Sequence, residues 1–365
     1  MQKVLIIGNG IAGLSCARLL ANRGWEIEIW GKHEFFSPTL ILNEITCNLL
    51  QDIWQLNPSF WNSLHLLQER KVSWGNDGTV LSIAEPSAVI NGNSLRDRLW
   101  EHLLDKHQNQ VQFQEVTVSI DNLLERQSEF TWIIDAGGRQ SAVAQKLGAG
   151  HRHSFGNRCI LSQEVRLANL VEEDIYWIET VSEGWLFLAP LGDNRAILQS
   201  MVPLLSGEPA SILINLLKQT RYIQDCIFQF SGTLAIFAAF PQILQPFCGE
   251  RWLAVGDASF SVDPISGDGT GYAIRGAILA ASIIDAVASG LSSSDCLEHY
   301  SLRLQKAFDA HIQQCFQYYL KGFTSSFWQW EIERMRKAQE LLQQTKNKDF
   351  TYTLKGFQFV KSENI

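Results

Sequence analysis

Residues 4–13, Val4-Leu5-Ile6-Ile7-Gly8-Asn9-Gly10-Ile11-Ala12-Gly13, decide the fold of this chain. Residues 4–7 form a continuous apolar run, which predicts a buried strand. A helix is predicted at residues 14–22, and Gly24 ends it before a second predicted strand at residues 25–30. The stretch therefore opens a β-α-β unit.

The turn between this first strand and the helix has the pattern G-x-G-x-x-G. In that setting Gly8 permits the tight turn, Gly10 lets the backbone approach a pyrophosphate, and Gly13 allows the helix to pack closely on the strand. The phosphates then lie at the positive N-terminus of the helix, beside Ile11 and Ala12. We predict a dinucleotide-binding site here rather than a purely structural glycine turn.

The acidic residue expected at the end of the second strand, where it would bind a ribose hydroxyl, is replaced by Gly31. Two nearby charges offer substitutes. Glu34 could reach the sugar from the following loop, and Lys32 could approach a phosphate. The alternative is that both are solvated loop charges, and the sequence leaves the choice open.

Composition excludes several classes of protein. The 365 residues are 46% hydrophobic, which is enough for a large core, and the net charge of −8 argues against a nucleic-acid partner. Seven scattered cysteines without C-x-x-C spacing indicate neither a disulfide framework nor a metal site. The first strand begins too early for a secretory leader, and the longest apolar run, residues 277–288, is too short for a membrane span. We expect a cytoplasmic protein in which that run is a buried helix.

The rest of the chain predicts an α/β fold with an insertion. A helix at 95–106 and strands at 111–118 and 130–134 continue the Rossmann pattern, which resumes at 252–257 with a long helix at 271–289. Between them, the alternating strands at 160–167, 175–181, 185–188 and 196–201 favour an antiparallel sheet. The predicted domains are a discontinuous Rossmann-type domain (1–151 and 241–294), an inserted antiparallel β-sheet substrate domain (152–240) and a helical C-terminal region (295–365).

A second motif indicates which dinucleotide binds. Gly256-Asp257-Ala258 ends an apolar strand, and Asp263-Pro264-Ile265-Ser266-Gly267-Asp268-Gly269-Thr270-Gly271 opens a helix. This pair resembles the second FAD fingerprint of the para-hydroxybenzoate hydroxylase superfamily of flavoprotein monooxygenases. The resemblance implies that Asp257 holds the ribityl chain. It also implies that the helix start, with Pro264, Gly267, Gly269, Thr270 and Gly271, presents amides to the pyrimidine edge of the flavin. A helix N-terminus there would stabilise the negative charge of reduced flavin. The alternative is a capped helix that merely follows a strand.

A third motif lies between these two. Asp135-Ala136-Gly137-Gly138-Arg139-Gln140-Ser141 resembles the middle fingerprint of the same superfamily, which adds Gly137 to the predicted cofactor site. An ordinary turn with a helix cap is the alternative.

The D-P-x-S-G-x-G form of the last motif is most similar to the branch that holds flavin-dependent tryptophan halogenases and geranylgeranyl reductases. The W-x-W-x-I-P motif of the halogenases corresponds here to residues 184–190, with Phe187 and Ala189 in place of the second Trp and the Ile, and their catalytic lysine has no identified counterpart. The chain also resembles small flavoproteins that help convert a tryptophan of a partner amino-acid oxidase into cysteine tryptophylquinone. This resemblance rests on residues 184–195, residues 263–271 and the Phe327-Trp328 pair.

The resemblance implies an FAD-dependent monooxygenase in which a flavin C4a-hydroperoxide hydroxylates an electron-rich aromatic ring, with a tryptophan of a partner protein as one candidate substrate. NAD(P)H or a separate reductase would supply electrons. The alternatives are a halogenase, a prenyl-chain reductase, and a non-catalytic flavoprotein that acts as a maturation chaperone. No catalytic side chain is singled out, because the cofactor carries the chemistry. Asp268, Arg139 and His33 are interpreted as structural or solvated.

Overall fold

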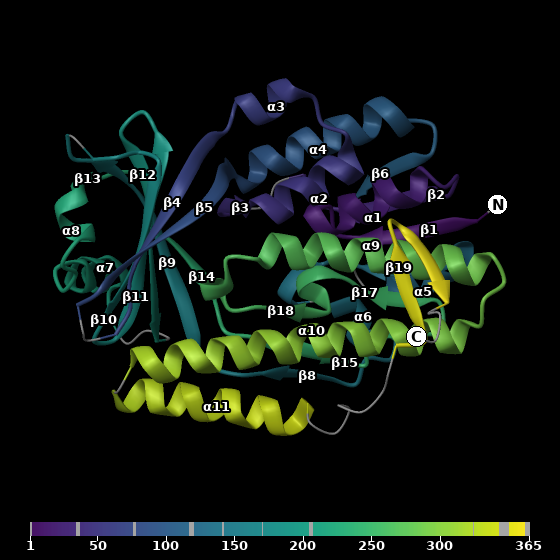
Figure 1. Cartoon of the computed structure of the whole chain (residues 1–365). Coiled ribbons are helices and arrows are strands. Elements are labelled where there is room, and N and C mark those ends of the chain that lie inside the picture. Colours follow the sequence, from purple (N-terminus) through teal and green to yellow (C-terminus); the bar gives the residue numbers. More distant parts are fainter. Residues whose placement is uncertain are drawn as a thin grey trace.

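The computed structural model describes residues 2–361 except 34–36, 76–77, 117–119, 141, 170, 204–206, 324 and 343–349. A six-stranded sheet carries the Rossmann half of the molecule (Figure 1). All its neighbouring strands are parallel except the pair at the β16 edge. In spatial order the strands are β16 (Cys248–Gly249), β17 (Trp252–Ala254), β7 (Trp132–Asp135), β1 (Lys3–Ile7), β2 (Glu26–Gly31) and β6 (Val111–Glu115).

Helices cover this sheet because its central strands are apolar on both faces. In β1 the residues after Lys3 are all buried, so each face needs an apolar cover. On one face α1 packs between α4 and α9, with α2 beside them. The smaller α5 and α6 belong to the same half. The helices are α1 (Ile11–Ala21), α2 (Glu44–Trp54), α3 (Pro58–Asn62), α4 (Gly92–His107), α5 (Ile120–Arg126), α6 (Ala142–Lys146) and α9 (Gly269–Ala288).

Helix α9 is long and apolar enough to cross a membrane by length and composition alone, but two thirds of its most apolar window (67%) is buried inside the protein. Ile274, Ile283 and Ile284 have no exposed surface, and the helix packs against both α1 and α10. It is therefore the buried helix predicted from the sequence, two residues longer at its start.

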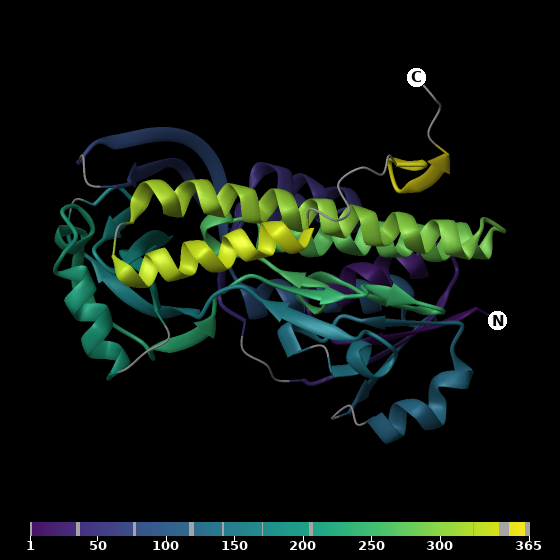
Figure 2. The same cartoon turned by 90° about the horizontal axis from the view of Figure 1, so that it is seen from below.

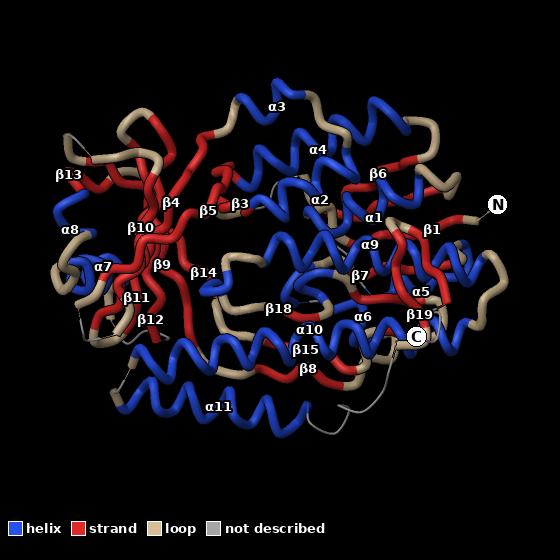
Figure 3. The backbone as a smooth tube through the Cα atoms, viewed as in Figure 1, coloured by secondary structure: helices blue, strands red, loops and turns tan. Residues whose placement is uncertain are grey.

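A second, nine-stranded sheet stands at the other end of the molecule (left in Figure 3). Helices α7 (Pro209–Leu217) and α8 (Ile223–Cys226) lie at this end. The strand order is β13 (Ile227–Phe230), β9 (Arg158–Leu167), β12 (Arg195–Pro203), β11 (Gly184–Gly192), β10 (Ile175–Val181), β4 (His65–Ser73), β5 (Val80–Asn91) and β3 (Thr39–Asn43), with β14 (Ala235–Ala238) also paired to β9.

This sheet corrects one predicted boundary. The substrate domain was predicted at residues 152–240, yet β3, β4 and β5 come from residues 39–91, which were assigned to the Rossmann domain. The join is a parallel pairing between β10 and β4, with Tyr176 opposite Arg70. Residues that pair across more than 100 positions leave no local pattern, so the sequence did not reveal this contribution.

The C-terminal region is helical, as predicted, over α10 (Ser293–Gly322) and α11 (Ser326–Leu342), which lie side by side along the length of the molecule (Figure 2). Its last part differs from the prediction. A hairpin of β19 (Tyr352–Lys355) and β20 (Gln358–Lys361) turns at Gly356, which has a positive φ of 61°. Tyr352 and Phe359 pack around His299 of α10, and this tertiary contact favours strands over helix. A small sheet of β8 (His151–Ser154), β15 (Gln242–Gln245) and β18 (Phe260–Ser261) completes the fold.

Candidate functional site

A cavity of about 500 Å³ lies between the two large sheets. One end is lined by loops at the carboxyl ends of β1, β7 and β17, where α1 and α9 begin. The other end is lined by side chains of the nine-stranded sheet. In open α/β sheets, ligands bind outside the carboxyl ends of the strands, and this cavity is in that place.

The first helix N-terminus at the cavity is formed by Gly10, Ile11 and Ala12, which all line it. Gly10 has φ −77° and ψ −178°, a conformation open to any residue, and a Cβ added to it would meet no atom within 4 Å. Within the described part of the chain, no side chain caps this end of α1. The free backbone N–H groups and the space over Gly10 suit a pyrophosphate.

The other two glycines of the motif have a structural part and do not line the cavity. Gly8 has a φ of +106°, and an added Cβ would lie 2.3 Å from the carbonyl oxygen of Ala136. At Gly13 a Cβ would lie 2.0 Å from the carbonyl oxygen of Gly8. Both glycines therefore allow backbone segments to approach closely, which holds α1 at the end of β1.

The segment after β2 does not bring the predicted Lys32 to the cavity. Its side chain is exposed and does not line the cavity, while its carbonyl oxygen accepts a hydrogen bond from the Asn9 amide. A Cβ at Gly31 would lie 2.6 Å from Asn9 Oδ1, so Asn9 occupies the space that the usual acidic side chain would need. Glu34 lies outside the described residues. Arg96 of α4, which belongs to no sequence motif, does line the cavity, and it donates to the His33 carbonyl oxygen at 3.0 Å.

A second helix N-terminus meets the cavity where α9 begins. Pro264, Gly267, Gly269 and Thr270 line it, whereas Gly271 is packed against Asp268 and does not. The N-cap residue of α9, Asp268, makes no capping hydrogen bond and pairs with Arg275 instead. The first N–H groups of this helix are therefore also available to a ligand.

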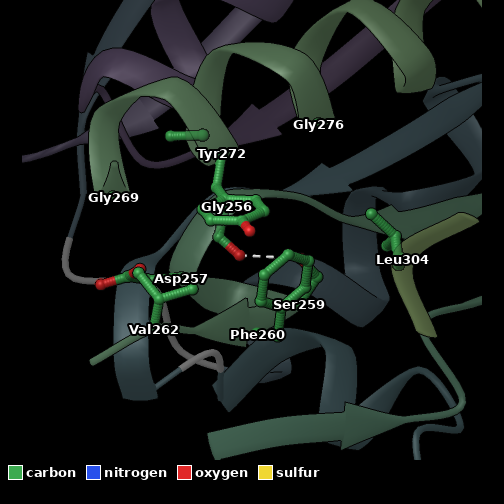
Figure 4. Close-up of a pocket in the computed structure, with 10 residues that line it drawn as sticks. Gly256, Asp257, Ser259, Phe260, Val262, Gly269, Tyr272, Gly276 and Leu304 are labelled. Atoms are coloured by element: carbon green, nitrogen blue, oxygen red, sulfur yellow. Dashed lines mark hydrogen bonds between the residues drawn. The ribbon is translucent and has the colours of Figure 1, made fainter. Parts of the chain in front are cut away.

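Asp257 lies between the two helix starts. Its side chain is exposed to the cavity, and Figure 4 shows it beside Val262 and the start of α9, with Phe260 and Tyr272 packed nearby. The surrounding protein raises the pKa of the Asp257 carboxyl, and Arg139 and Arg152 oppose that shift. Gly256 before it has a φ of +62° and packs against Ala12, which brings the two motifs together.

The middle motif holds the loop between these parts. Asp135 is buried and accepts hydrogen bonds from the N–H groups of Gly137 at 2.9 Å and Ala144 at 2.7 Å. Gly137 itself does not line the cavity, but Ala136, Gly138 and Arg139 do. Gly137 instead shapes the loop, because its backbone N–H donates the hydrogen bond to Asp135.

The sheet end of the cavity combines aromatic rings with a polar group that no sequence motif marked. The rings belong to Tyr176, Trp185, Phe187 and Phe237. Arg70 also lines the cavity, and its Nε lies 3.0 Å from Oε2 of Glu85. The alternation of side chains along these strands could have shown that Arg70 and Tyr176 each lie on one face of a sheet. That this face lines the cavity became clear only from the pairing of β10 with β4.

Lys71, the residue after Arg70, points to the opposite face of the sheet. Its ammonium lies 5.5 Å from the ring centre of Trp177, which packs in the core beneath that face. Among the described residues, no lysine lines the cavity.

The loop of the last motif is anchored by a buried histidine. His311 of α10 has no exposed surface, and its Nε2 accepts the backbone N–H of Asp263 at 2.8 Å. Burial first, and then the charge of Arg158, lower the pKa of His311 to about 3. Cys315 lies 3.3 Å from Nε2, and the ring of Tyr272 is also adjacent.

This histidine predicts a pH dependence of stability. An unfolded histidine titrates near 6.5, so between pH 6.5 and 3 the unfolded chain binds a proton that the folded chain does not, and stability falls as the pH falls. From pH 7 to pH 5 we expect His311 to contribute a loss of about 2 kcal/mol. Urea unfolding at both pH values should show a smaller loss for His311→Gln, whose amide oxygen can still accept the Asp263 N–H. The exposed control His151→Gln should match the unchanged protein, and equal losses in all three chains would contradict the assignment.

Comparison with known proteins gives two partial sequence relatives. LodB of Marinomonas mediterranea, named as an FAD-dependent oxidoreductase, is 27% identical over 155 residues, which cover 40% of this chain and 42% of LodB. The flavin-dependent halogenase armH5 of Armillaria mellea is 27% identical over 176 residues, covering 42% of this chain and 34% of armH5. The matches thus span less than half of either relative. No family model matches the chain.

Solved structures show the fold over nearly the whole chain. The myxobacterial chondrochloren halogenase CndH has a TM-score of 0.78 at 17% identity and covers 95% of this chain and 91% of its own. The flavin-dependent halogenase CmlS has 0.77 at 17%, covering 93% and 70%. QhpG, a peptidyl tryptophan dihydroxylase essential for tryptophylquinone cofactor biogenesis, has 0.72 at 17%, covering 90% and 78%. The predicted α/β class is confirmed, and the fold is that of FAD-dependent halogenases.

Proposed function

We propose that this chain is an FAD-dependent oxidoreductase that uses reduced flavin and oxygen to oxidise an electron-rich aromatic substrate. The observation that carries the proposal is one cavity with two uncapped helix N-termini at one end and aromatic side chains at the other. FAD is the cofactor named for LodB and for CndH, and a flavin is named for armH5 and CmlS. FAD suits the cavity because its phosphates, sugar chain and ring would meet the α1 start, Asp257 and the α9 start in that order.

The residues present fit the cofactor in three places. The start of α1, where Gly10 leaves an open space, would hold the pyrophosphate. Asp257, exposed to the cavity, would hold the ribityl hydroxyls. The start of α9, near Gly267 and Gly269, would hold the pyrimidine edge of the flavin, where a helix N-terminus stabilises negative charge. When bound and reduced, FAD supplies the electrons that activate oxygen.

The nine-stranded sheet would hold the substrate. Trp185 and Phe187 of β11 and Tyr176 of β10 give the cavity a wall of rings that suits a flat aromatic molecule by edge and face contacts. The Arg70 and Glu85 pair beside them would bind a polar group at the edge of that ring. These side chains would orient the substrate and exclude water from the reacting ring.

Two outcomes of the oxidation are open to this site, halogenation and hydroxylation. The comparisons favour halogenation, because most of the similar solved structures are halogenases. Two observations favour hydroxylation. Among the described residues no lysine lines the cavity, whereas the halogenases depend on a catalytic lysine. The likeness to QhpG, which acts on a peptidyl tryptophan, extends the candidate substrates to a tryptophan of a partner protein.

The deciding experiment measures halide dependence. The purified protein is reconstituted with FAD, reduced by NAD(P)H with a flavin reductase, and given oxygen with indole and phenol substrates and a tryptophan-containing peptide, each with and without bromide. Products that carry bromine would assign a halogenase, and products heavier by one oxygen, independent of bromide, would assign a hydroxylase. An FAD-loaded protein that yields neither, and only binds the peptide, would replace the enzyme by a flavin-bearing chaperone. Alkene reduction without oxygen would indicate a prenyl-chain reductase.

Substitution of Asp257 by asparagine tests the predicted ribityl contact. Asparagine keeps the shape but loses the charge, and two acceptor sites become donors, so we expect FAD to bind about tenfold more weakly, a cost near 1.4 kcal/mol. Titration of the apo-protein with FAD, followed by flavin fluorescence, measures the change. Asp285→Asn is the matched control, because Asp285 is a half-exposed carboxylate near the far end of α9 that pairs with Arg23 and does not line the cavity. Equal weakening in both variants would remove Asp257 from the site.

A further inference from the structure

A cluster of charged side chains lies fully buried behind the cavity. Arg158 of β9, Asp263 before α9 and Glu331 of α11 all have side chains with 0% exposure. Arg158 donates to Asp263 at 2.8 Å and to Glu331 at 2.5 Å. One cation thus joins two carboxylates from the flavin-side loop and from the C-terminal helix.

Tyr319 of α10 extends this cluster to the cavity wall. Its hydroxyl lies 2.9 and 3.0 Å from the two Asp263 oxygens and accepts the indole N–H of Trp185 at 3.2 Å. Trp185 in turn lines the cavity with the aromatic group of the substrate sheet. The buried charges therefore touch both the loop of the last motif and the substrate wall.

Backbone groups complete the anchoring. Asp263 accepts the N–H of Ile265 at 2.9 Å, which fixes the turn whose next residues, Ser266 and Gly267, line the cavity. Glu331 accepts the N–H of Asn157 at 2.7 Å, at the start of β9. A shift of Glu331 would therefore be passed to the loop through Arg158.

Stability alone does not account for such a cluster. Removing three charges from water costs several kcal/mol for each ion, and apolar side chains of similar volume commonly give equal or greater stability. Burial raises the pKa of both Asp263 and Glu331, and Arg158 opposes each shift. The charged groups add geometric specificity instead. Their hydrogen bonds can all form only when β9, the loop before α9, α10 and α11 are in one particular arrangement.

We propose that Glu331 and Tyr319 are positioning residues of the flavin site: through Arg158 and Asp263, the C-terminal helices set the geometry of the loop 263–267 and of the Trp185 ring. This inference rests on the proposed function, since the loop is the place where the flavin would bind. It gives a part in the site to α10 and α11, whose described residues do not line the cavity.

Two matched pairs of variants test the inference. Tyr319→Phe removes the hydroxyl that Asp263 and Trp185 share, and Tyr318→Phe removes the neighbouring hydroxyl on an exposed position of the same helix. Glu331→Gln weakens the pairing with Arg158, and Glu333→Gln makes the same change at a half-exposed position of α11. Thermal unfolding of each variant first establishes that it is folded.

The first readout needs no cofactor. Hydrogen exchange of the backbone N–H groups of Asp263, Ile265, Ser266 and Gly267 is measured in the apo-protein, and we expect it to be at least about tenfold faster in Tyr319→Phe and Glu331→Gln than in the two controls. The second readout is the visible circular dichroism of the bound flavin, which we expect to change in the same two variants. In Glu331→Gln, turnover of an indole substrate should fall by about fivefold or more while its KM stays within about twofold, since Glu331 does not line the cavity.

Each result has a clear reading. Unchanged exchange and an unchanged flavin spectrum in folded Tyr319→Phe would overturn the inference, even if the melting temperature falls. If Glu331→Gln does not fold, Tyr319→Phe carries the test. If the unchanged protein binds no FAD, the proposed function fails, and the exchange of the loop amides still decides whether the helices position that loop.

Discussion

Replacing Gly10 by valine is expected to abolish FAD binding and to leave the apo-protein folded. The backbone of Gly10 lies in a region open to L-residues, and an added Cβ meets no protein atom within 4 Å. The new side chain would instead fill the space over the N-terminus of α1, where the pyrophosphate would bind. We expect the Kd for FAD to rise at least about 100-fold, equivalent to about 2.7 kcal/mol. The free energy of unfolding of the apo-protein should change by less than about 0.5 kcal/mol.

The same substitution at Gly13 is the control, and its outcome should be the reverse. A Cβ there would lie 2.0 Å from the carbonyl oxygen of Gly8, so α1 would have to move away from β1. Gly13→Val should therefore unfold or aggregate before FAD binding can be measured. FAD titration and urea unfolding of both variants separate the two effects. A Gly10→Val protein that still binds FAD with the original affinity would place the pyrophosphate elsewhere.

Replacing Arg158 by methionine is expected to cause a large loss of stability. Methionine has a similar length but leaves Asp263 and Glu331 buried without their cation. Breaking a buried pair by removing one partner typically costs about 3–5 kcal/mol, because an uncompensated charge remains. Urea unfolding at pH 7 would measure the loss. Lowering the pH should reduce it, since protonation removes the charge of the carboxylates.

Two further variants show whether charge is the cause. Arg195→Met removes a partly exposed arginine that pairs with Glu164 at 3.7 Å, and it should cost less than about 1 kcal/mol. The triple variant Arg158→Met, Asp263→Asn, Glu331→Gln removes all three buried charges and should recover more than half of the stability lost by the single variant. A triple variant no more stable than Arg158→Met would show that packing, not charge, dominates.

The sequence alone determined the Rossmann half and located the two helix starts to within three residues. Helix α1 begins at Ile11 where residue 14 was predicted, and α9 begins at Gly269 where residue 271 was predicted. Close spacing explains this success: the strand, the glycine turn and the helix around Gly10 are neighbours in the chain, so local periodicity and turn chemistry specify them. The same holds for the strand before Asp257 and for helix α9. The motif also predicted the roles of Gly8 and Gly13, a tight turn and close packing of the helix. It did not show which backbone atoms come so close to them.

Only the tertiary structure decided which residues share the cavity. Arg70, Glu85 and Arg96 lie far from every motif, and Lys32 and Gly137 belong to motifs yet do not line the cavity. The sheet that carries Arg70 is built from segments more than 100 residues apart, and Arg158, Asp263 and Glu331 meet from three elements. A buried charge is recognised only by its partners, and long-range partners have no spacing that a sequence displays. For this reason the motifs located the end of the cavity where the proposed cofactor would bind, and the folded chain alone located the aromatic wall of the cavity and the charges behind it.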